Sequence, residues 1–337
     1  LLAGGGVRPT GWDHPTAGIP AGRAAVEVGG IVAVTVAGVA ALVWAFLPAT
    51  APPAAGRGPR AAVAALVGHD DSDSLAPFCT RADRSYVFSP DRRAVIGYRV
   101  LLGTALVGGD PVGAVEAVPG AVTAFLDTCD RQGWRPAVLG ASDAMAGYWR
   151  SRGLASGLVI GDEAIVDLPS FTLASRRMRN VRQAIARTRN AGVRVEVGPL
   201  DQATATALRP VLDEWLRHHP ERGFAMNLDQ ILVPRPDCVF AVAYDRDGVP
   251  QAFARFAASA GGRILTLDVA PRRHGAPNGV TERLFFEMIG YGRGHGATEL
   301  SLNFAGMRGL LTADGWLARR ASGVVGLLDR WIQLAPL

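Results

Sequence analysis

The feature that most constrains this sequence is an uncharged apolar run over residues 28–47, and the residues that follow it remain uncharged up to position 56. A run of this length matches the roughly 20 residues that an α-helix needs to cross the core of a bilayer. Trp44, near one end of the run, suits a position at the membrane interface. We therefore predict a transmembrane helix over residues 28–47, with a buried core helix as the alternative.

The segment after this run is rich in Pro, Ala and Gly from Ala51 to Arg60, which predicts a linker. Arginines flank the run on both sides, so their distribution does not set the orientation of the helix. A cleaved signal peptide is disfavoured, because a long segment precedes the run. We therefore assign residues 1–60 to a membrane segment and its linker.

Charge and composition exclude several classes of site. The net charge is +5, and all 35 basic residues are Arg. The absence of Lys excludes a Schiff base and a Walker-type phosphate lysine. Three separated cysteines, without a CxxC or HExxH motif, predict neither a disulfide framework nor a zinc site. A basic chain instead favours an anionic partner, whether RNA, phosphate or an anionic lipid surface.

Beyond the linker, short apolar β runs alternate with amphipathic helices, which predicts a mixed α/β fold. The predicted strands are 86–88, 94–100, 105–107, 137–139, 164–168, 238–244, 251–257, 263–269 and 299–302. The predicted helices are 121–131, 203–217 and 280–291.

The two halves of this region share a weak repeat. A strand leads to Asp110, and Pro119 follows nine residues later before a helix. Another strand leads to Asp268, and Pro277 follows nine residues later before another helix. Each helix then leads through a glycine-containing turn to a further strand. This pattern indicates an internal duplication, with a chance match of sparse residues as the alternative.

A strongly basic segment lies between the halves. Seven arginines fall between positions 176 and 194, with no Asp or Glu between Asp167 and Glu196. Met178, Val181 and Ile185 form an apolar seam, which predicts an amphipathic helix over residues 173–191 with a cationic outer surface. The alternative is a solvated basic helix. Because nothing in the segment compensates the charge, an anionic partner is favoured, either tRNA backbone or lipid headgroups.

Several of these pieces, in their order and spacing, resemble one family. They are AVIGYRVLLGTALVGGDPV from position 94, WRPAVLGAS from 134, RMRNVRQAIARTR from 177, ERGF from 221, LDVAPRRHGAPNG from 267 and LSLNFAGM from 300. The stretch from about position 73 to 311 resembles the cytoplasmic catalytic region of bacterial aminoacyl-phosphatidylglycerol synthases, the phosphatidylglycerol lysyltransferase family.

The resemblance implies tandem acetyltransferase-like (GNAT-like) domains behind a membrane helix, at residues 61–198 and 199–337, the second being catalytic. It implies an aminoacyl-tRNA donor, phosphatidylglycerol as the acceptor, and a location at the cell membrane with the catalytic domains on the cytoplasmic side. The residues 28–47 then look like the last helix of a longer membrane region. Ester exchange from an activated donor needs no cofactor and no metal.

The catalytic candidates are Asp268 and Arg272. A carboxylate at the end of an apolar strand can hold an ammonium group or accept a proton, whereas a turn-capping Asp is the structural alternative. The family commonly has Asp, two apolar residues and then Arg, whereas here Arg272 is displaced by one position. Arg272 or Arg273 could stabilise an oxyanion or bind phosphate, with solvent-exposed side chains as the alternative.

The substrate-binding candidates extend around this strand. Glu221 matches the Glu-x-Gly-Phe piece, which implies binding of the substrate ammonium group, and a surface carboxylate is the alternative. Asn278 and Asn303 can hydrogen-bond to the substrate or cap turns. The loop RRHGAPNG has Pro277 where an acetyl-CoA loop needs a backbone N–H, which disfavours coenzyme A. The candidates for tRNA binding are Arg176, Arg177, Arg179, Arg182, Arg187 and Arg189.

The reading as a whole is an aminoacyl-tRNA-dependent aminoacyltransferase that modifies membrane charge. The transferred amino acid is expected to be lysine, with alanine as an alternative. Other readings keep the fold but use diacylglycerol or a peptidoglycan precursor as the acceptor. A further reading is a non-catalytic, membrane-tethered protein that binds RNA or lipid. The sequence does not indicate the oligomeric state.

Overall fold

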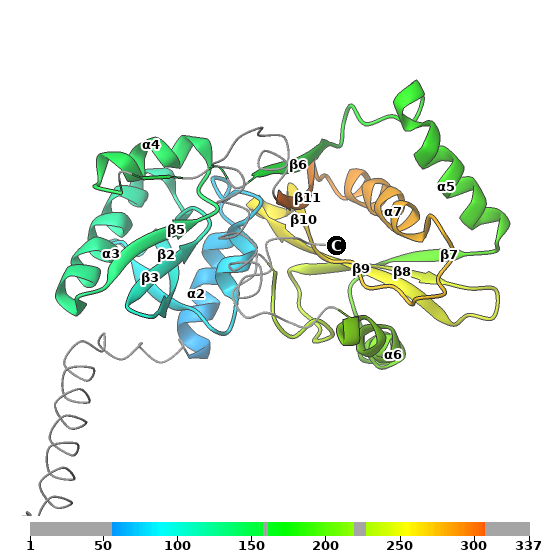
Figure 1. Cartoon of the computed structure of the whole chain (residues 1–337), viewed down its shortest axis with the longest axis horizontal. Coiled ribbons are helices and arrows are strands. Elements are labelled where there is room, and N and C mark those ends of the chain that lie inside the picture. The colour runs from blue at the N-terminus through cyan, green and yellow to red at the C-terminus, as the bar shows by residue number, and fades with distance from the viewer. Residues whose placement is uncertain (1–55, 155, 158, 160, 219–226, 307–337) are drawn as a thin grey trace, which may run out of the picture. The chain divides into compact units, whose positions relative to one another are not determined.

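The computed structural model describes residues 56–154, 156–157, 159, 161–218 and 227–306. Backbone contacts divide the chain into two units, Leu1–Pro48 and Ala49–Leu337. All of the described residues belong to the second unit, where helices pack against two β-sheets (Figure 1). The predicted mixed α/β class is therefore confirmed.

The membrane helix predicted over residues 28–47 lies outside the described residues. Within the part of the chain that the structure describes, no helix is long and apolar enough to cross a bilayer.

The first half of the described chain contains a sheet of order β1-β2-β3-β5, with the short β4 paired to β2. Its elements are α2 (Arg57–Val67), η1 (Ala76–Thr80), β1 (Ser85–Phe88), β2 (Ala94–Leu101), β3 (Thr104–Gly108), β4 (Val112–Gly113), η2 (Val115–Ala117), α3 (Val118–Gln132), β5 (Arg135–Leu139) and α4 (Asp143–Ser151). Tyr98, Phe125 and Trp149 pack in one buried aromatic cluster between the sheet, α3 and α4.

The second half contains a sheet of order β6-β11-β10-β9-β8-β7. Its elements are β6 (Gly161–Asp167), η3 (Arg176–Met178), α5 (Arg179–Asn190), β7 (Arg194–Gly198), α6 (Gln202–His218), β8 (Cys238–Tyr244), β9 (Pro250–Ser259), η4 (Ala260–Gly262), β10 (Ile264–Val269), α7 (Val280–Gly294) and β11 (Glu299–Gly306). The central strands are almost continuously apolar because both of their faces are covered, by α7 on one side and α6 on the other.

The predicted strand–helix–strand repeat is present in both halves. In the first, β3 and β5 pair in parallel on either side of α3, and in the second, β10 and β11 pair in parallel on either side of α7. Each unit is preceded by an antiparallel strand, β2 or β9. The two aspartates differ in position, since Asp110 follows the end of β3 whereas Asp268 lies inside β10.

We predicted the boundary between the two domains at residues 198 and 199, but the strand pairing places the division between the two sheets earlier in the chain. Both β6 and β7 precede that boundary, yet they form the two edges of the second sheet. Their apolar side chains Val166, Val195 and Val197 pack against the core of that sheet, which explains their membership. The pairing therefore separates the halves between α4 and β6.

The segment around η1 joins the two halves. Phe78 is buried in the core formed with α6 and the second sheet. The hydroxyl of Ser259 donates to the carbonyl oxygen of Asp73 at 2.8 Å, and that of Thr266 donates to the carbonyl oxygen of Ser74 at 2.7 Å. A first-half segment thus lies directly against β9 and β10, the strands that carry the candidate site.

Candidate functional site

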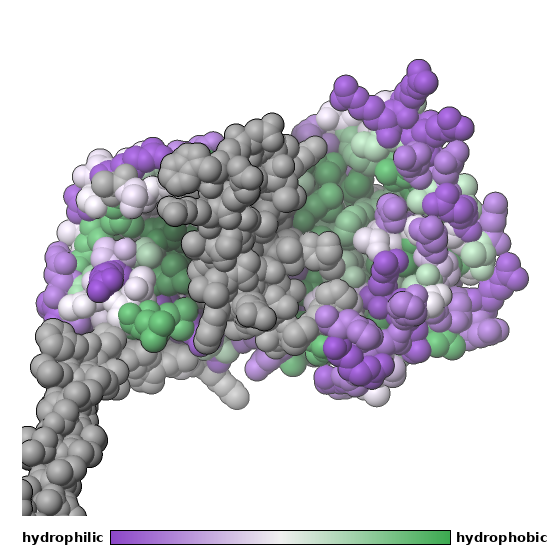
Figure 2. Space-filling view, viewed as in Figure 1, coloured by the Kyte–Doolittle hydropathy of each residue, from purple (hydrophilic) through white to green (hydrophobic). Residues whose placement is uncertain are grey.

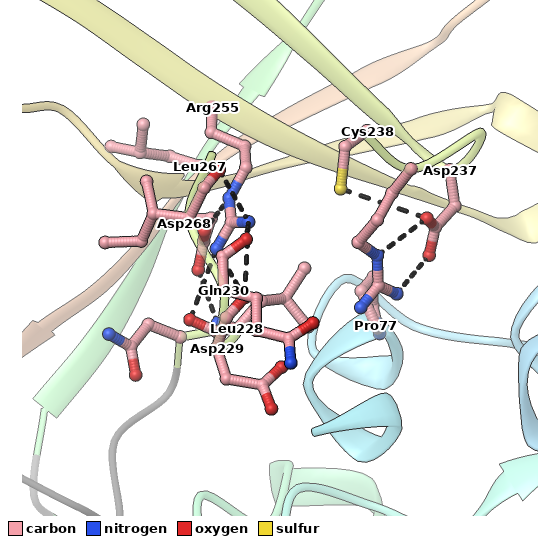
Figure 3. Close-up of polar contacts among 12 residues, drawn as sticks. Pro77, Leu228, Asp229, Gln230, Asp237, Cys238, Arg255, Leu267 and Asp268 are labelled. Carbon is pink, nitrogen blue, oxygen red and sulfur yellow. Dashed lines mark hydrogen bonds and ion pairs between the residues drawn. The ribbon is translucent and has the colours of Figure 1, made fainter. Parts of the chain in front are cut away.

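The centre of the candidate site is a buried ion pair between neighbouring strands. Nε of Arg255 on β9 donates to Oδ2 of Asp268 on β10 at 2.5 Å, and both side chains are 0% exposed. The backbone N–H of Leu228 donates to Oδ1 of Asp268 at 2.6 Å (Figure 3). Burial raises the pKa of Asp268, and the Arg255 guanidinium opposes that rise. Both carboxylate oxygens are therefore engaged by internal donors.

The remaining donors of Arg255 hold the loop over residues 228–231. Its Nη1 and Nη2 atoms donate to four successive backbone carbonyl oxygens at 3.1–3.4 Å, those of Leu228, Asp229, Gln230 and Ile231. Gln230 adopts a left-handed conformation, with φ at 51°, which turns the loop around the guanidinium. A buried arginine needs this many acceptors because an unsatisfied charge in the core is costly.

The same loop contacts the first half of the chain. Just before the loop, Asn227 accepts two hydrogen bonds from Nη1 of Arg81, at its backbone and side-chain oxygens, each at 2.9 Å. The backbone N–H of Ala82 donates to Oδ2 of Asp229 at 2.9 Å. A continuous set of contacts thus runs from Asp268 through Arg255 and the loop to the first half.

The other predicted site residues near Asp268 fall into two groups. Arg272 and Asn278 are exposed, in the segment between β10 and α7. Arg273 is half-buried, and its Nε donates to the carbonyl oxygen of Pro250 at 3.0 Å. Arg272 forms an isolated bridge with Ala252, so this segment runs along the start of β9. Of these, Arg272 and Asn278 are placed to meet a ligand from solvent.

Asn303 is buried where β10 and β11 diverge. The two strands pair only from Ile264 to Thr266, and the register of β11 with β6 shifts just after Ser301. There Asn303 has a φ of 67°, and its Nδ2 donates to the carbonyl oxygen of Leu267 at 2.9 Å. This residue therefore bridges the separating strands beside Asp268. Glu221 lies outside the described residues.

The predicted basic helix is present as η3 followed by α5, and its six candidate arginines are all exposed. Ala184, Ile185 and Thr188 form its buried face. Figure 2 shows a hydrophilic surface over this region. Arg194, the last arginine of the basic segment, begins β7, because Gly192 with a φ of 77° ends the helical turn before it.

Helix α7 packs against the basic helix. A Cβ added to Gly279, at the start of α7, would lie 2.8 Å from the Cβ of Ala184, so the two backbones approach closely. Glu287 pairs with Arg283 at 2.8 Å and lies 3.9 Å from Arg189. Four other arginines have no ion-pairing carboxylate among the described residues: Arg176, Arg177, Arg179 and Arg187. An uncompensated cationic surface results.

Comparison with known proteins then decides the family. The family described as "Phosphatidylglycerol lysyltransferase, C-terminal" matches residues 64–337. The chain belongs to this lysyltransferase family. It is 37% identical over 307 residues to the "MprF-like domain protein Rv1619" of Mycobacterium tuberculosis, covering 87% of this chain and 63% of that protein.

A second relative is the "Lysylphosphatidylglycerol biosynthesis bifunctional protein LysX" of Gordonia bronchialis. It is 40% identical over 290 residues, which cover 81% of this chain and 25% of that protein. This chain therefore spans about a quarter of the length of LysX and under two thirds of the length of the MprF-like domain protein.

Solved structures support the fold. A structure of L-PGS from Bacillus licheniformis has a TM-score of 0.71 at 22% identity, covering 82% of this chain and 85% of that one. The C-terminal domain of a putative lysylphosphatidylglycerol synthetase from Agrobacterium fabrum has a TM-score of 0.66 at 25% identity, covering 74% and 78%. Both likenesses span the two sheets rather than one of them.

Arg255 was not among the site residues that we predicted from the sequence. The signal was available, because Arg255 is the one charged residue in the β9 sequence PQAFARFAAS. A charge inside a strand that is buried on both faces requires a buried partner. Asp268 is the one charged residue of β10, so the pair could have been inferred from the two strands together.

Among the described residues, no group of three His, Cys, Asp or Glu side chains could hold a metal ion. Cys79, Cys129 and Cys238 are buried and form no disulfide.

Proposed function

We propose that this chain transfers an amino acid from aminoacyl-tRNA to phosphatidylglycerol. The observation that carries the proposal is the family match over residues 64–337, which includes both halves. The exposed arginines of α5 support it, because a donor with a polyanionic backbone requires a cationic surface.

The reaction is an ester exchange. A glycerol hydroxyl oxygen of the lipid attacks the carbonyl carbon of the aminoacyl ester, and the bond from that carbon to the ribose oxygen breaks. The proton of the glycerol hydroxyl ends on the ribose oxygen that leaves. Since the donor ester is already activated, the protein contributes positioning, proton movement and stabilisation of the tetrahedral oxyanion.

We propose different roles for the residues around β10. Arg272 and Asn278 are exposed and would contact the substrate, with Arg272 close to phosphate or the oxyanion. Asp268 would act through Arg255 as a positioning residue rather than as the base, because both of its oxygens accept internal hydrogen bonds. Asn303 would keep the strands apart beside Asp268, and Arg273 would hold the loop.

The finer assignments rest on the relatives' names and on general chemistry. We propose lysine as the transferred amino acid, since LysX is named for lysylphosphatidylglycerol biosynthesis. Alanine is the alternative. We also propose that the reaction occurs at the inner leaflet of the cell membrane, where aminoacyl-tRNA is present. Glu221 remains our sequence-based candidate for binding the substrate ammonium group.

Incubation of the full chain with charged tRNA and lipid vesicles tests the proposal. We expect phosphatidylglycerol vesicles and lysyl-tRNA to give a lysyl adduct by mass spectrometry, with none from free lysine. Arg272→Gln should lower the rate about a hundredfold or more, the scale of one transition-state contact. Arg93→Gln is the matched control, an exposed arginine paired with Glu116 in the first half.

Product with only diacylglycerol or a peptidoglycan precursor would reassign the acceptor. Binding without turnover would indicate a non-catalytic protein.

The role of α5 has its own test. Replacing Arg179 and Arg187 with Gln should weaken tRNA binding and reduce the salt slope by about 2, one for each lost phosphate contact. The Arg93→Gln variant should keep the wild-type slope. An unchanged slope in the double variant would assign α5 to lipid headgroups or to solvent.

A further inference from the structure

The segment between β10 and α7 carries Arg272, the exposed side chain that we propose to contact the substrate. The first part of this segment is paired with the start of β9. The backbone N–H of Phe253 donates to the carbonyl oxygen of Pro271 at 2.9 Å. The backbone N–H of Arg273 donates to the carbonyl oxygen of Gln251, also at 2.9 Å. Arg272 lies between these two bonds, so its backbone position depends on this short pairing.

Beyond Arg273 the chain leaves β9, and a hydrogen bond to α6 then holds it. The backbone N–H of His274 donates to Oε1 of Glu214 on α6 at 2.7 Å. The next bond along the segment is local, from the N–H of Ala276 to the carbonyl oxygen of Arg273. Among the hydrogen bonds of the described residues, the Glu214 contact is therefore the one that ties residues 274–276 to a separate helix or strand.

Glu214 presents its carboxylate from a firmly packed helix. In the preceding turn of α6, Val211 and Leu212 are buried in the core that α6 forms with the second sheet. A hydrogen bond from an N–H to a charged carboxylate is roughly twice as strong as one between neutral groups. The Glu214 carboxylate binds backbone, and in the part of the chain that the structure describes no carboxylate pairs with Arg272. The guanidinium of Arg272 therefore stays available to an anion.

We propose that Glu214 is a positioning residue for the transfer reaction. Its bond to His274 closes the far end of the short pairing with β9, so that Arg272 keeps one backbone position. Two bonds at the end of a sheet open easily by themselves, whereas a third bond from a separate helix opposes that opening. The inference rests on the proposed function, in which Arg272 contacts phosphate or the oxyanion. A contact of this kind loses rate when it is misplaced by a fraction of an ångström.

Steady-state kinetics of the full chain, with lysyl-tRNA and phosphatidylglycerol vesicles, test this role. Glu214→Ala should lower kcat/KM about tenfold, less than the loss from Arg272→Gln, because the guanidinium is misplaced rather than removed. Glu214→Gln keeps an oxygen that accepts the His274 N–H, so its kcat/KM should stay within about threefold of the wild-type value. Asp213→Ala is the matched control and should match the wild type, since Asp213 is an exposed carboxylate of the same helix.

A double-mutant cycle separates positioning from a general effect on the fold. If Glu214 acts through Arg272, adding Glu214→Ala to the Arg272→Gln variant should lower the rate by less than about twofold further. Losses that multiply in the double variant would overturn the proposal. A loss from Asp213→Ala equal to that from Glu214→Ala would overturn it as well.

Hydrogen exchange gives a readout that does not depend on transfer. In Glu214→Ala, the backbone amide of His274 should exchange at least about tenfold faster, while the amides of β8 keep their wild-type rates. Unchanged exchange at His274 would overturn the proposal. Absence of transfer by the wild-type chain, together with faster exchange at His274 in the variant, would instead contradict the proposed function and leave the contact between Glu214 and the segment established.

Discussion

Asp110 and Asp268 occupy corresponding positions in the two repeated units, but the surroundings of their carboxylates differ. Asp268 is inside β10, fully buried, and paired with Arg255 at 2.5 Å. Asp110 lies beyond the end of β3, is only partly buried, and accepts a hydrogen bond from the Ser142 N–H at 3.1 Å. Asp268 lies one residue before the end of its strand and Asp110 lies two residues beyond the end of its strand, and this shift of three residues separates a core ion pair from a loop contact.

The difference extends to the partners of each carboxylate. Asp268 is tied to a cation, whereas Asp110 lies near other carboxylates, and its charge helps to raise the pKa of Asp73 to about 7. Glu163 acts on Asp73 in the same direction, although burial is the largest cause. The second half thus neutralises its buried charge by pairing, and the first half does so by protonation.

The largest expected effect comes from breaking the pair in the second half. Arg255→Leu leaves Asp268 buried without a cation and releases four loop carbonyls, so we expect the free energy of unfolding to fall by about 3–5 kcal/mol. Chemical denaturation of the full chain in detergent measures it. Asp268→Asn keeps the size and an acceptor and should cost less. A loss below about 1 kcal/mol for Arg255→Leu would contradict a structural role for the pair.

Hydrogen exchange distinguishes that role from a general loss of stability. In Asp268→Asn, backbone amides of residues 228–231 and of Ala82 should exchange faster than those of β8. Uniform acceleration across the second sheet would mean that the pair stabilises the whole half rather than the loop.

Much of this architecture was predictable, but helices α2 and α4 were not predicted, and residues 57–60, which we predicted as part of a linker, instead begin α2. The strands and helices of both units were predicted within a few residues because their apolar periodicity is strong, as in β8 and α7. The edge strands were misassigned or missed, because β6 and β7 alternate polar and apolar residues and their partner sheet is set by contacts distant in sequence.

The candidate site was predicted less well than the fold. Local pattern placed Asp268 at the end of an apolar strand, but its burial depends on Arg255 across a strand pair and on a loop 40 residues earlier. The exposed arginines of α5 were predictable, because a helix with one apolar seam and no acidic residue has one possible outer surface.

An intermediate effect is expected from the carboxylate of Asp73. Its pKa is about 7 in the folded protein against an ordinary value of 3.8, so the folded state binds the proton more tightly. The stability that this proton contributes is therefore lost as pH rises towards 7. Between pH 5.5 and 7.5 we expect the free energy of unfolding to fall by about 1–2 kcal/mol more in the wild type than in Asp73→Asn. Asp247→Asn, at an exposed turn, is the control.

The smallest expected change in the free energy of unfolding comes from a variant of Asp110 that keeps its hydrogen bond and removes its charge. Asp110→Asn keeps an oxygen to accept the Ser142 N–H but removes one source of repulsion on Asp73. The pKa of Asp73 should move down towards its ordinary value, and the protein at pH 7.5 should gain a few tenths of a kcal/mol. Because the pKa of Asp73 is lower in this variant, the pH range over which the free energy of unfolding falls should also move to lower pH. A destabilisation above about 1 kcal/mol would instead show that the carboxylate is paired like Asp268, which would remove the contrast between the two halves.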